Sequence, residues 1–126
     1  MAEQIKDQSI DEKEMDAAME EAEKTSRTTR TVKLKHPLEY NGVTYTELHF
    51  DFDKLRGKDS LEVEAEIERT TGISVVVPAI NAEFQTRIAA RACEEPIGRD
   101  ALLNMNLFDY NGIRNMARNF MLRSDR

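Results

Sequence analysis

The chain has 126 residues, enough for one domain with a modest hydrophobic core. It is 33% charged and 40% hydrophobic, with a formal net charge of -6. No run of apolar residues approaches the roughly 18 that a bilayer span requires, so we expect no membrane partner. The acidic start is not typical of a secretory signal, and the single cysteine, Cys93, excludes an internal disulfide. The expected location is the cytoplasm.

Residues 1–29 are predicted to be an acidic leader. Residues 1–24 hold nine acids and three lysines, which account for the whole net charge, whereas the rest of the chain has equal numbers of acids and bases. The polar, acidic composition of the leader favours a disordered segment. Apolar residues recur at helical spacing from Ile10 to Ala22, so the alternative is a helix that is stable only when docked. Phosphate backbones would repel this leader, so nucleic acid is not an expected partner.

Residues 30–126 are predicted to form a single α+β domain that begins with a β-hairpin over residues 31–52. Val32 and Leu34 alternate with lysines, as in a half-buried strand. Pro37 is expected to end the strand pairing because proline has no N–H to donate. Asn41-Gly42 is typical of a two-residue hairpin turn.

The second strand of this hairpin is predicted to have one mainly apolar face. Its alternate residues lie on that face: Thr44, Thr46, Leu48, Phe50 and Phe52. Two strands alone are marginally stable in water, so helices must cover the face.

Residues 61–71 alternate acidic and apolar side chains and fit either a strand or a helix. Capping residues at 58–60 and Gly72 after the segment favour the helix. Its glutamates are interpreted as a solvated surface: Glu62, Glu64, Glu66 and Glu68. The β-branched residues 73–77 that follow are either an extended connector or a short edge strand stopped by Pro78.

Two further helical stretches are predicted. The first has an apolar residue at every fourth position and ends before Pro96: Ile80, Phe84, Ile88 and Ala92. Asp100 is expected to cap a short turn, and Asp109 a longer helix with an apolar stripe. The stripe comprises Ile113, Met116, Ala117 and Phe120. Arg123 and Arg126 lie near its C-terminal end, where the helix dipole favours positive charge. The predicted fold is a hairpin packed against three or more helices.

Residues with catalytic or metal-binding chemistry are few. His36 and His49 lie on opposite sides of the hairpin turn and, with a carboxylate, could bind zinc, but surface histidines are the simpler interpretation. Cys93 follows a run of small helical residues and is interpreted as a buried structural thiol rather than a nucleophile. The chain has no phosphate-binding glycine loop or nucleophile elbow. We therefore predict no enzyme activity, no cofactor and no metal.

The C-terminal stretch from Leu102 to Leu122 is rich in apolar and methionine side chains. This is more apolar surface than one helix face usually buries, and methionine adapts to irregular partners. A contiguous exposed remainder would mark an interaction site. The hypothesis places protein binding at Leu107, Phe108, Ile113, Met116 and Phe120.

The order of these motifs resembles a known family. The motifs are the hairpin phrase Leu34-Lys-His-Pro-Leu-Glu-Tyr-Asn-Gly42 with Val43-Thr-Tyr-Thr-Glu-Leu48, the turn Leu55-Arg-Gly-Lys-Asp59, the helix Ile88-Ala-Ala-Arg-Ala92, and the ending Leu107-Phe-Asp109 with Arg118-Asn-Phe-Met-Leu122. Over residues 31–122 the chain resembles the small tail assembly chaperones of Mu-like and related contractile-tailed bacteriophages. None of these motifs is catalytic.

The resemblance implies a binding function in viral tail morphogenesis. Such a chaperone coats the tape measure protein in the host cytoplasm before the tail tube polymerises. Tail tube protein is recruited through a longer form made by ribosomal frameshifting. A homo-oligomer is left open. The alternative is an acidic adaptor or inhibitor module that docks on a basic protein through residues 1–29.

Overall fold

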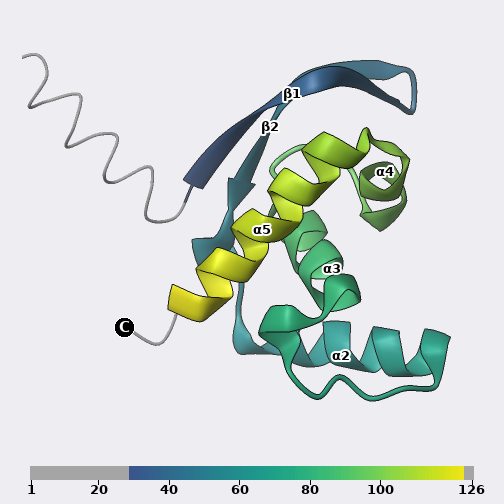
Figure 1. Ribbon diagram of the computed structural model, residues 1–126, viewed down its shortest axis with the longest axis vertical. Coiled ribbons are helices and arrows are strands. Elements are labelled where there is room, and N and C mark those ends of the chain that lie inside the picture. Colours follow the sequence, from purple (N-terminus) through teal and green to yellow (C-terminus); the bar gives the residue numbers. More distant parts are fainter. Residues whose placement is uncertain (1–28, 124–126) are drawn as a thin grey trace, which may run out of the picture.

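The computed structural model describes residues 29–123, so the predicted leader, apart from Thr29, lies outside the described residues, as does Arg126. Its elements are β1 (Thr29–Tyr40), β2 (Val43–Asp51), the 3-10 turn η1 (Phe52–Lys54), α2 (Gly57–Thr71), the 3-10 turn η2 (Pro78–Ile80), α3 (Ala82–Ala92), α4 (Arg99–Asn104) and α5 (Leu107–Arg123). A hairpin followed by helices is the α+β fold predicted from the sequence (Figure 1). None of the helices between residues 29 and 123 is both long and apolar enough to cross a bilayer.

The hairpin forms where the turn signal lies. Asn41 and Gly42 adopt φ angles of 51° and 79°, the left-handed conformations that a tight two-residue turn requires. Leu48, Phe50 and Phe52 are buried, as their shared face predicts, whereas Thr44 and Thr46 are exposed.

β1 continues through Pro37 to Tyr40, so the prediction that proline ends the strand pairing is wrong. Lys33 pairs with Glu47, and Leu38 pairs with Tyr45. Residues 34–37 of β1 therefore lie opposite the single residue Thr46 as a large bulge. Proline is tolerated there because a bulge leaves its residues out of the regular ladder.

α2 confirms the helical interpretation of residues 61–71, but it begins earlier than expected. Its first residue is Gly57, and Asp59 accepts a hydrogen bond from the backbone N–H of Arg56 at 2.7 Å. Residues 58–60 therefore lie inside the first turn, where Asp59 supplies an acceptor from within. Gly72 ends the helix in the left-handed conformation with φ of 75°, as predicted.

α3 lies at the centre of the helical layer, in contact with α2, α4 and α5 (Figure 1). Phe84, Ile88 and Ala92 are buried as predicted, but Ile80 belongs to η2 and is 66% exposed. The side chain of Asn81 accepts from the N–H of Phe84 at 2.8 Å, which starts the helix after Ile80. Residues 73–77 form an extended connector rather than a strand.

α5 crosses the hairpin and packs on α3 and β1. Ile113 and Ala117 are buried, with Met116 and Phe120 half-buried beside them, which confirms the apolar stripe. Asp109 is the third residue of this helix, not its cap, because the helix begins at Leu107. Asp100 likewise lies in the first turn of α4 rather than before it.

Candidate protein-binding surface

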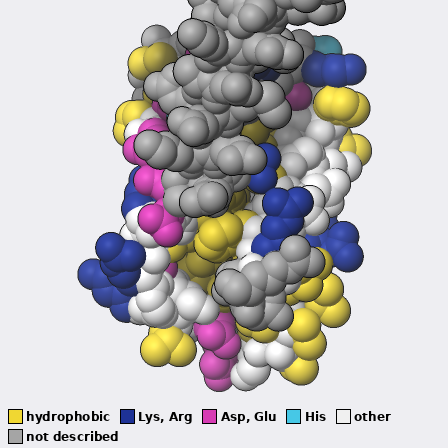
Figure 2. Space-filling view, turned by 90° about the vertical axis from the view of Figure 1, so that its left-hand side faces the viewer, with side chains coloured by type: hydrophobic (Ala, Val, Ile, Leu, Met, Phe, Trp, Pro, Cys, Tyr) yellow, Lys and Arg dark blue, Asp and Glu magenta, His cyan; other side chains and the backbone are white. Residues whose placement is uncertain are grey.

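Large hydrophobic side chains that remain exposed gather at two connections between helices. The α2–α3 patch consists of Ile73, Val76, Val77 and Ile80. The α4–α5 corner consists of Leu103, Leu107 and Phe108. Figure 2 shows hydrophobic side chains at the lower end of the molecule, where Figure 1 places α2 and the connection that carries the α2–α3 patch.

The hypothetical binding residues on α5 divide into two groups. Leu107 and Phe108 are 68% and 63% exposed and belong to the α4–α5 corner. Ile113 is only 1% exposed, so its assignment to a binding surface is wrong. The ring of Phe120 is stacked on Phe52 with centroids 4.7 Å apart, and Met116 is half-buried against the same core. The apolar stripe predicted from the sequence is therefore the face of α5 that packs in the core. Side chains buried there are not available to bind a partner.

The exposed Phe108 has a defined environment. Its backbone N–H donates to the side chain of Asn106 at 2.9 Å, at the start of α5. The ammonium of Lys35 lies 4.3 Å from the centre of its ring, a cation–π contact with β1. Leu103 lies near the end of α4, and Leu107 and Phe108 are the first two residues of α5. The corner is thus an apolar surface on two helices, bordered by a cation.

The α2–α3 patch was not identified as a binding surface from the sequence. Val76 is 87% exposed there, the highest exposure among the large hydrophobic side chains of residues 29–123. The available signal was a β-branched run with no charged residue, which also fits a buried strand. η2 packs against α5 and α3, and this holds the end of the patch against the body.

The two histidines do not lie together. β1 pairs Thr31 with His49, so the exposed His36 lies further along the strand towards the turn. Nδ1 of His49 is 2.6 Å from Oε2 of Glu95, and the backbone N–H of His49 donates to Oε1 of that carboxylate at 2.8 Å. This hydrogen bond raises the pKa of His49. Among the described residues no group of three or more His, Cys, Asp or Glu side chains could hold a metal ion.

Cys93 is buried, as interpreted from the sequence. It follows α3 and forms an isolated β-bridge with Phe50. Burial raises the pKa of its thiol to about 12, so the reactive thiolate is scarce at neutral pH.

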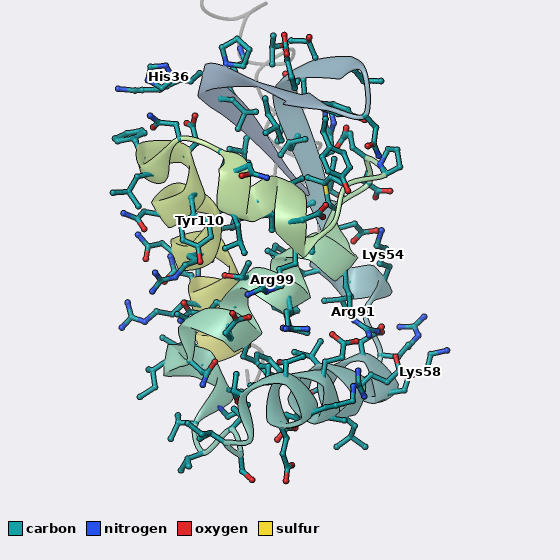
Figure 3. All side chains as sticks on the ribbon, turned by 90° about the vertical axis from the view of Figure 1, so that its right-hand side faces the viewer. His36, Lys54, Lys58, Arg91, Arg99 and Tyr110 are labelled. Carbon is teal, nitrogen blue, oxygen red and sulfur yellow. The ribbon has the colours of Figure 1, made fainter. Side chains whose placement is uncertain are left out.

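The glutamates of α2 are not simply a solvated surface, which corrects their interpretation. Arg91 of α3 contacts Asp59 at 2.8 Å and both Glu62 and Glu66 at 2.7 Å. Arg87 adds a contact of 3.1 Å to Glu66. Figure 3 shows Arg91 extending from α3 towards α2. These carboxylates link two helices, whereas Glu68 of the same helix is exposed.

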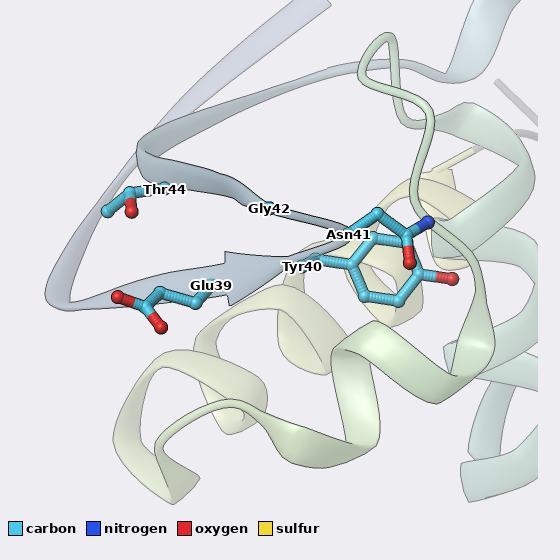
Figure 4. Close-up of a pocket in the computed structure, with 5 residues that line it drawn as sticks. All are labelled: Glu39, Tyr40, Asn41, Gly42 and Thr44. Atoms are coloured by element: carbon cyan, nitrogen blue, oxygen red, sulfur yellow. The ribbon is translucent and has the colours of Figure 1, made fainter.

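A pocket of about 380 Å³ lies at the hairpin tip (Figure 4). It is lined by residues of the turn itself: Glu39, Tyr40, Asn41, Gly42 and Thr44. The hydroxyl of Tyr40 donates to the carboxylate of Asp100 at 3.0 Å, which fastens the tip to α4. The pocket gathers no set of converging charged side chains, so it adds little to the two apolar patches.

No protein family matches the chain, and neither do any of the curated proteins or solved structures compared with it. Its surface between residues 29 and 123 carries exposed apolar side chains and carboxylates paired with arginines, and Cys93 lies buried beneath it. Exposed apolar patches of this kind are typical of surfaces that bind other proteins.

Proposed function

We propose that this chain is a non-catalytic phage tail assembly chaperone that binds apolar segments of the tape measure protein in the host cytoplasm. The observation that supports the proposal is the α4–α5 corner, where Leu107 and Phe108 are 68% and 63% exposed at the start of a helix. In this proposal tail tube subunits are recruited by a longer, frameshifted form of the chain.

The chemistry of the corner suits a helical client. A client helix presents apolar side chains at i, i+3 and i+4, and a small cluster of leucine and phenylalanine side chains can accept them. Burying one such side chain fully contributes roughly 1.5–3 kcal/mol before ordering costs are subtracted. A few contacts of this size bind reversibly, as a chaperone must.

Many copies on one long client would hold it more firmly than one copy. Linked binding events gain from effective concentration without any new contact. The α2–α3 patch offers a second apolar surface on each copy. Together the patches would keep the apolar faces of the client from aggregating until tube subunits arrive.

The test is co-purification with the tape measure protein, the client named in this proposal. We expect Leu107→Asp combined with Phe108→Asp to abolish co-purification, because a charge on each side chain opposes its burial. The matched control is Leu61→Asp, which changes a side chain that is 70% exposed on α2. Both variants should keep the wild-type unfolding midpoint. Full recovery of the client with the double variant would contradict the proposal.

Removal of residues 1–28 separates the chaperone from the acidic adaptor. The chaperone retains its client because the corner is untouched, whereas an adaptor that docks through its leader loses its partner. Val76→Asp, tested in the same assay, shows whether the α2–α3 patch shares in client binding.

A further inference from the structure

One face of α5 points away from the core. In Figure 1 this helix lies in front of the hairpin and α3, and it packs on β1 and α3 through its opposite side. With 3.6 residues per turn, a set of exposed residues lies within about 60° of Asn115 around the helix axis. These residues form the outer face of α5: Phe108, Asn111, Gly112, Asn115, Arg118, Asn119 and Leu122.

The composition of the outer face is unusual for a solvated helix surface. Such surfaces are normally built from charged residues and strong helix formers, whereas asparagine and glycine are among the weaker ones. A Cβ atom at Gly112 would meet no atom within 4 Å beyond the helix backbone, so packing within the described chain does not require glycine there. The side chains of Asn111, Asn115 and Asn119 form no hydrogen bond with any residue between 29 and 123. The described fold therefore gives no reason for these choices.

The pattern of residue types on the outer face is symmetric about Asn115. Phe108 and Leu122, its two apolar residues, lie at equal distances along the sequence before and after Asn115. Asn111 and Asn119 are also equally spaced on either side of it. A contact between two identical surfaces about a twofold axis must be self-complementary, and this arrangement meets that condition when two α5 helices lie antiparallel.

Gly112 and Arg118 fit the same arrangement. They too are equally spaced on either side of Asn115, so the arginine of one copy lies opposite the glycine of the other. Glycine has no side chain and leaves room for the arginine. Arg118 is the only charged residue of the outer face. The two copies of Arg118 would lie roughly 9 Å apart along the helices, about one Debye length at physiological salt, so their repulsion is weak.

We propose that α5 pairs with α5 of a second copy of this chain, antiparallel, about a twofold axis at Asn115. Phe108 and Leu122, which are 63% and 50% exposed, then cover each other at both ends of the contact. The asparagine amides carry both donors and acceptors and can pair across the axis. The symmetry of the residues identifies the occupant, because a helix without this symmetry would match only half of the face. So few contacts make a weak, reversible dimer.

The pairing would also regulate the α4–α5 corner, to which Phe108 belongs. A client that covers Phe108 competes with the second copy, so the free chain is paired and the loaded chain is not. Only this consequence rests on the proposed function. A chain that is always monomeric yet co-purifies with its client would overturn the pairing alone. A chain that pairs but never retains the client would contradict the proposed function alone.

Sedimentation of the full chain over a range of concentrations measures the pairing. We expect the mass to rise from monomer towards dimer as the concentration increases. Leu122→Lys removes one apolar end with a charge that suits the C-terminus of a helix, and it should raise the dissociation constant by about tenfold or more. The matched control Leu61→Lys changes a side chain that is 70% exposed on α2 and should leave it unchanged. A monomer at every concentration, or equal effects of the two substitutions, would overturn the proposal.

Disulfide cross-linking tests the orientation of the two helices. In Asn115→Cys the new thiols meet at the axis and should form a covalent dimer on oxidation, whereas the native Cys93 is buried. Asn111→Cys alone should not cross-link, because its two copies lie roughly 12 Å apart along the helices, beyond the reach of a disulfide. Its mixture with Asn119→Cys should cross-link. Efficient cross-linking of Asn111→Cys with itself would indicate parallel helices and refute the antiparallel pair.

Discussion

The backbone N–H of Lys35 donates to Oδ1 of Asp109 at 2.9 Å, joining two residues 74 positions apart in the sequence. The other carboxylate oxygen of Asp109 accepts from the N–H of His36 at 3.1 Å. Both N–H groups belong to the bulge of β1 and are drawn to α5 instead of β2. The carboxylate also lies in the first turn of α5, where the helix dipole favours negative charge.

Asp109→Ala should therefore destabilise the fold, because the carboxylate accepts from two N–H groups of β1. The substitution leaves two part-buried N–H groups without their acceptor, and we expect the free energy of unfolding to fall by about 1–3 kcal/mol. Asp109→Asn retains an acceptor oxygen and should cost less. Urea unfolding of the three proteins measures the difference. Wild-type stability in Asp109→Ala would show that the carboxylate is dispensable to the bulge.

Arg91 should hold α2 against α3. Its side chain is 28% exposed and contacts three carboxylates, so Arg91→Ala should cost about 1–2 kcal/mol, between typical surface and buried ion pairs. The control Arg69→Ala, in an exposed position on α2, should stay within about 0.5 kcal/mol of wild type. Equal costs for the two substitutions would contradict a role for the ion pairs.

The same ion pairs predict a loss of stability in acid. Burial alone would raise the pKa of Glu66, but hydrogen bonds from Arg91 and Arg87 outweigh it and lower the pKa. The backbone N–H of Arg56 and the side chain of Arg91 lower the pKa of Asp59. A carboxylate whose pKa is lower in the folded protein than in the unfolded chain stabilises the fold at pH values above its unfolded pKa of about 4. This contribution is lost as the pH falls through the pKa of the folded state. Unfolding free energies from pH 6 to pH 3 should therefore fall less steeply in Arg91→Ala, and parallel curves would refute the assignment.

The pair of His49 and Glu95 predicts the opposite trend, a loss of stability as the pH rises. The hydrogen bond to Glu95 raises the pKa of His49 above its unfolded value of about 6.5. Its contribution is fully present below about pH 6.5 and is lost as the pH rises through the folded pKa. The stability advantage of wild type over His49→Gln should shrink across this range. An NMR titration that places His49 at or below its unfolded value would contradict the prediction, and Glu95→Gln should remove the shift.

The two groups of apolar residues on α5 should respond differently to truncation. Ile113→Ala removes a side chain that is 1% exposed and should lower the free energy of unfolding by about 2–4 kcal/mol. Leu107→Ala changes a side chain that is 68% exposed and should stay within about 0.5 kcal/mol of wild type. Chemical denaturation distinguishes them. A large cost for Leu107→Ala would mean that its side chain is buried in solution and unavailable to a client.

Local signals in the sequence were sufficient for much of the fold. Asn41-Gly42 predicted the turn because few residues adopt positive φ, and Gly72 predicted the end of α2 for the same reason. The face shared by Leu48, Phe50 and Phe52 predicted which side of the hairpin the helices cover. Each of these features depends on neighbours within a few positions.

The features that could not be predicted depend on distant partners. Pro37 lies in the bulge of β1, where Asp109 of α5 accepts from the two N–H groups that precede the proline. From the sequence, that aspartate was expected to cap a helix instead. Glu62 and Glu66 resemble any exposed helical acids until α3 brings Arg91 beside them. On the binding surface the sequence identified Leu107 and Phe108 but also selected Ile113, because hydrophobicity alone does not distinguish a core stripe from an exposed one.

The carboxylate that completes the bulge of β1 also affects how the protein folds as it is made. Synthesis delivers the hairpin first, but the acceptor for the N–H groups of Lys35 and His36 arrives only with residue 109. A nascent chain that has emerged only as far as α3 cannot complete its first strand. We expect the hairpin to acquire its final register late in translation, in the same step that docks the last helix.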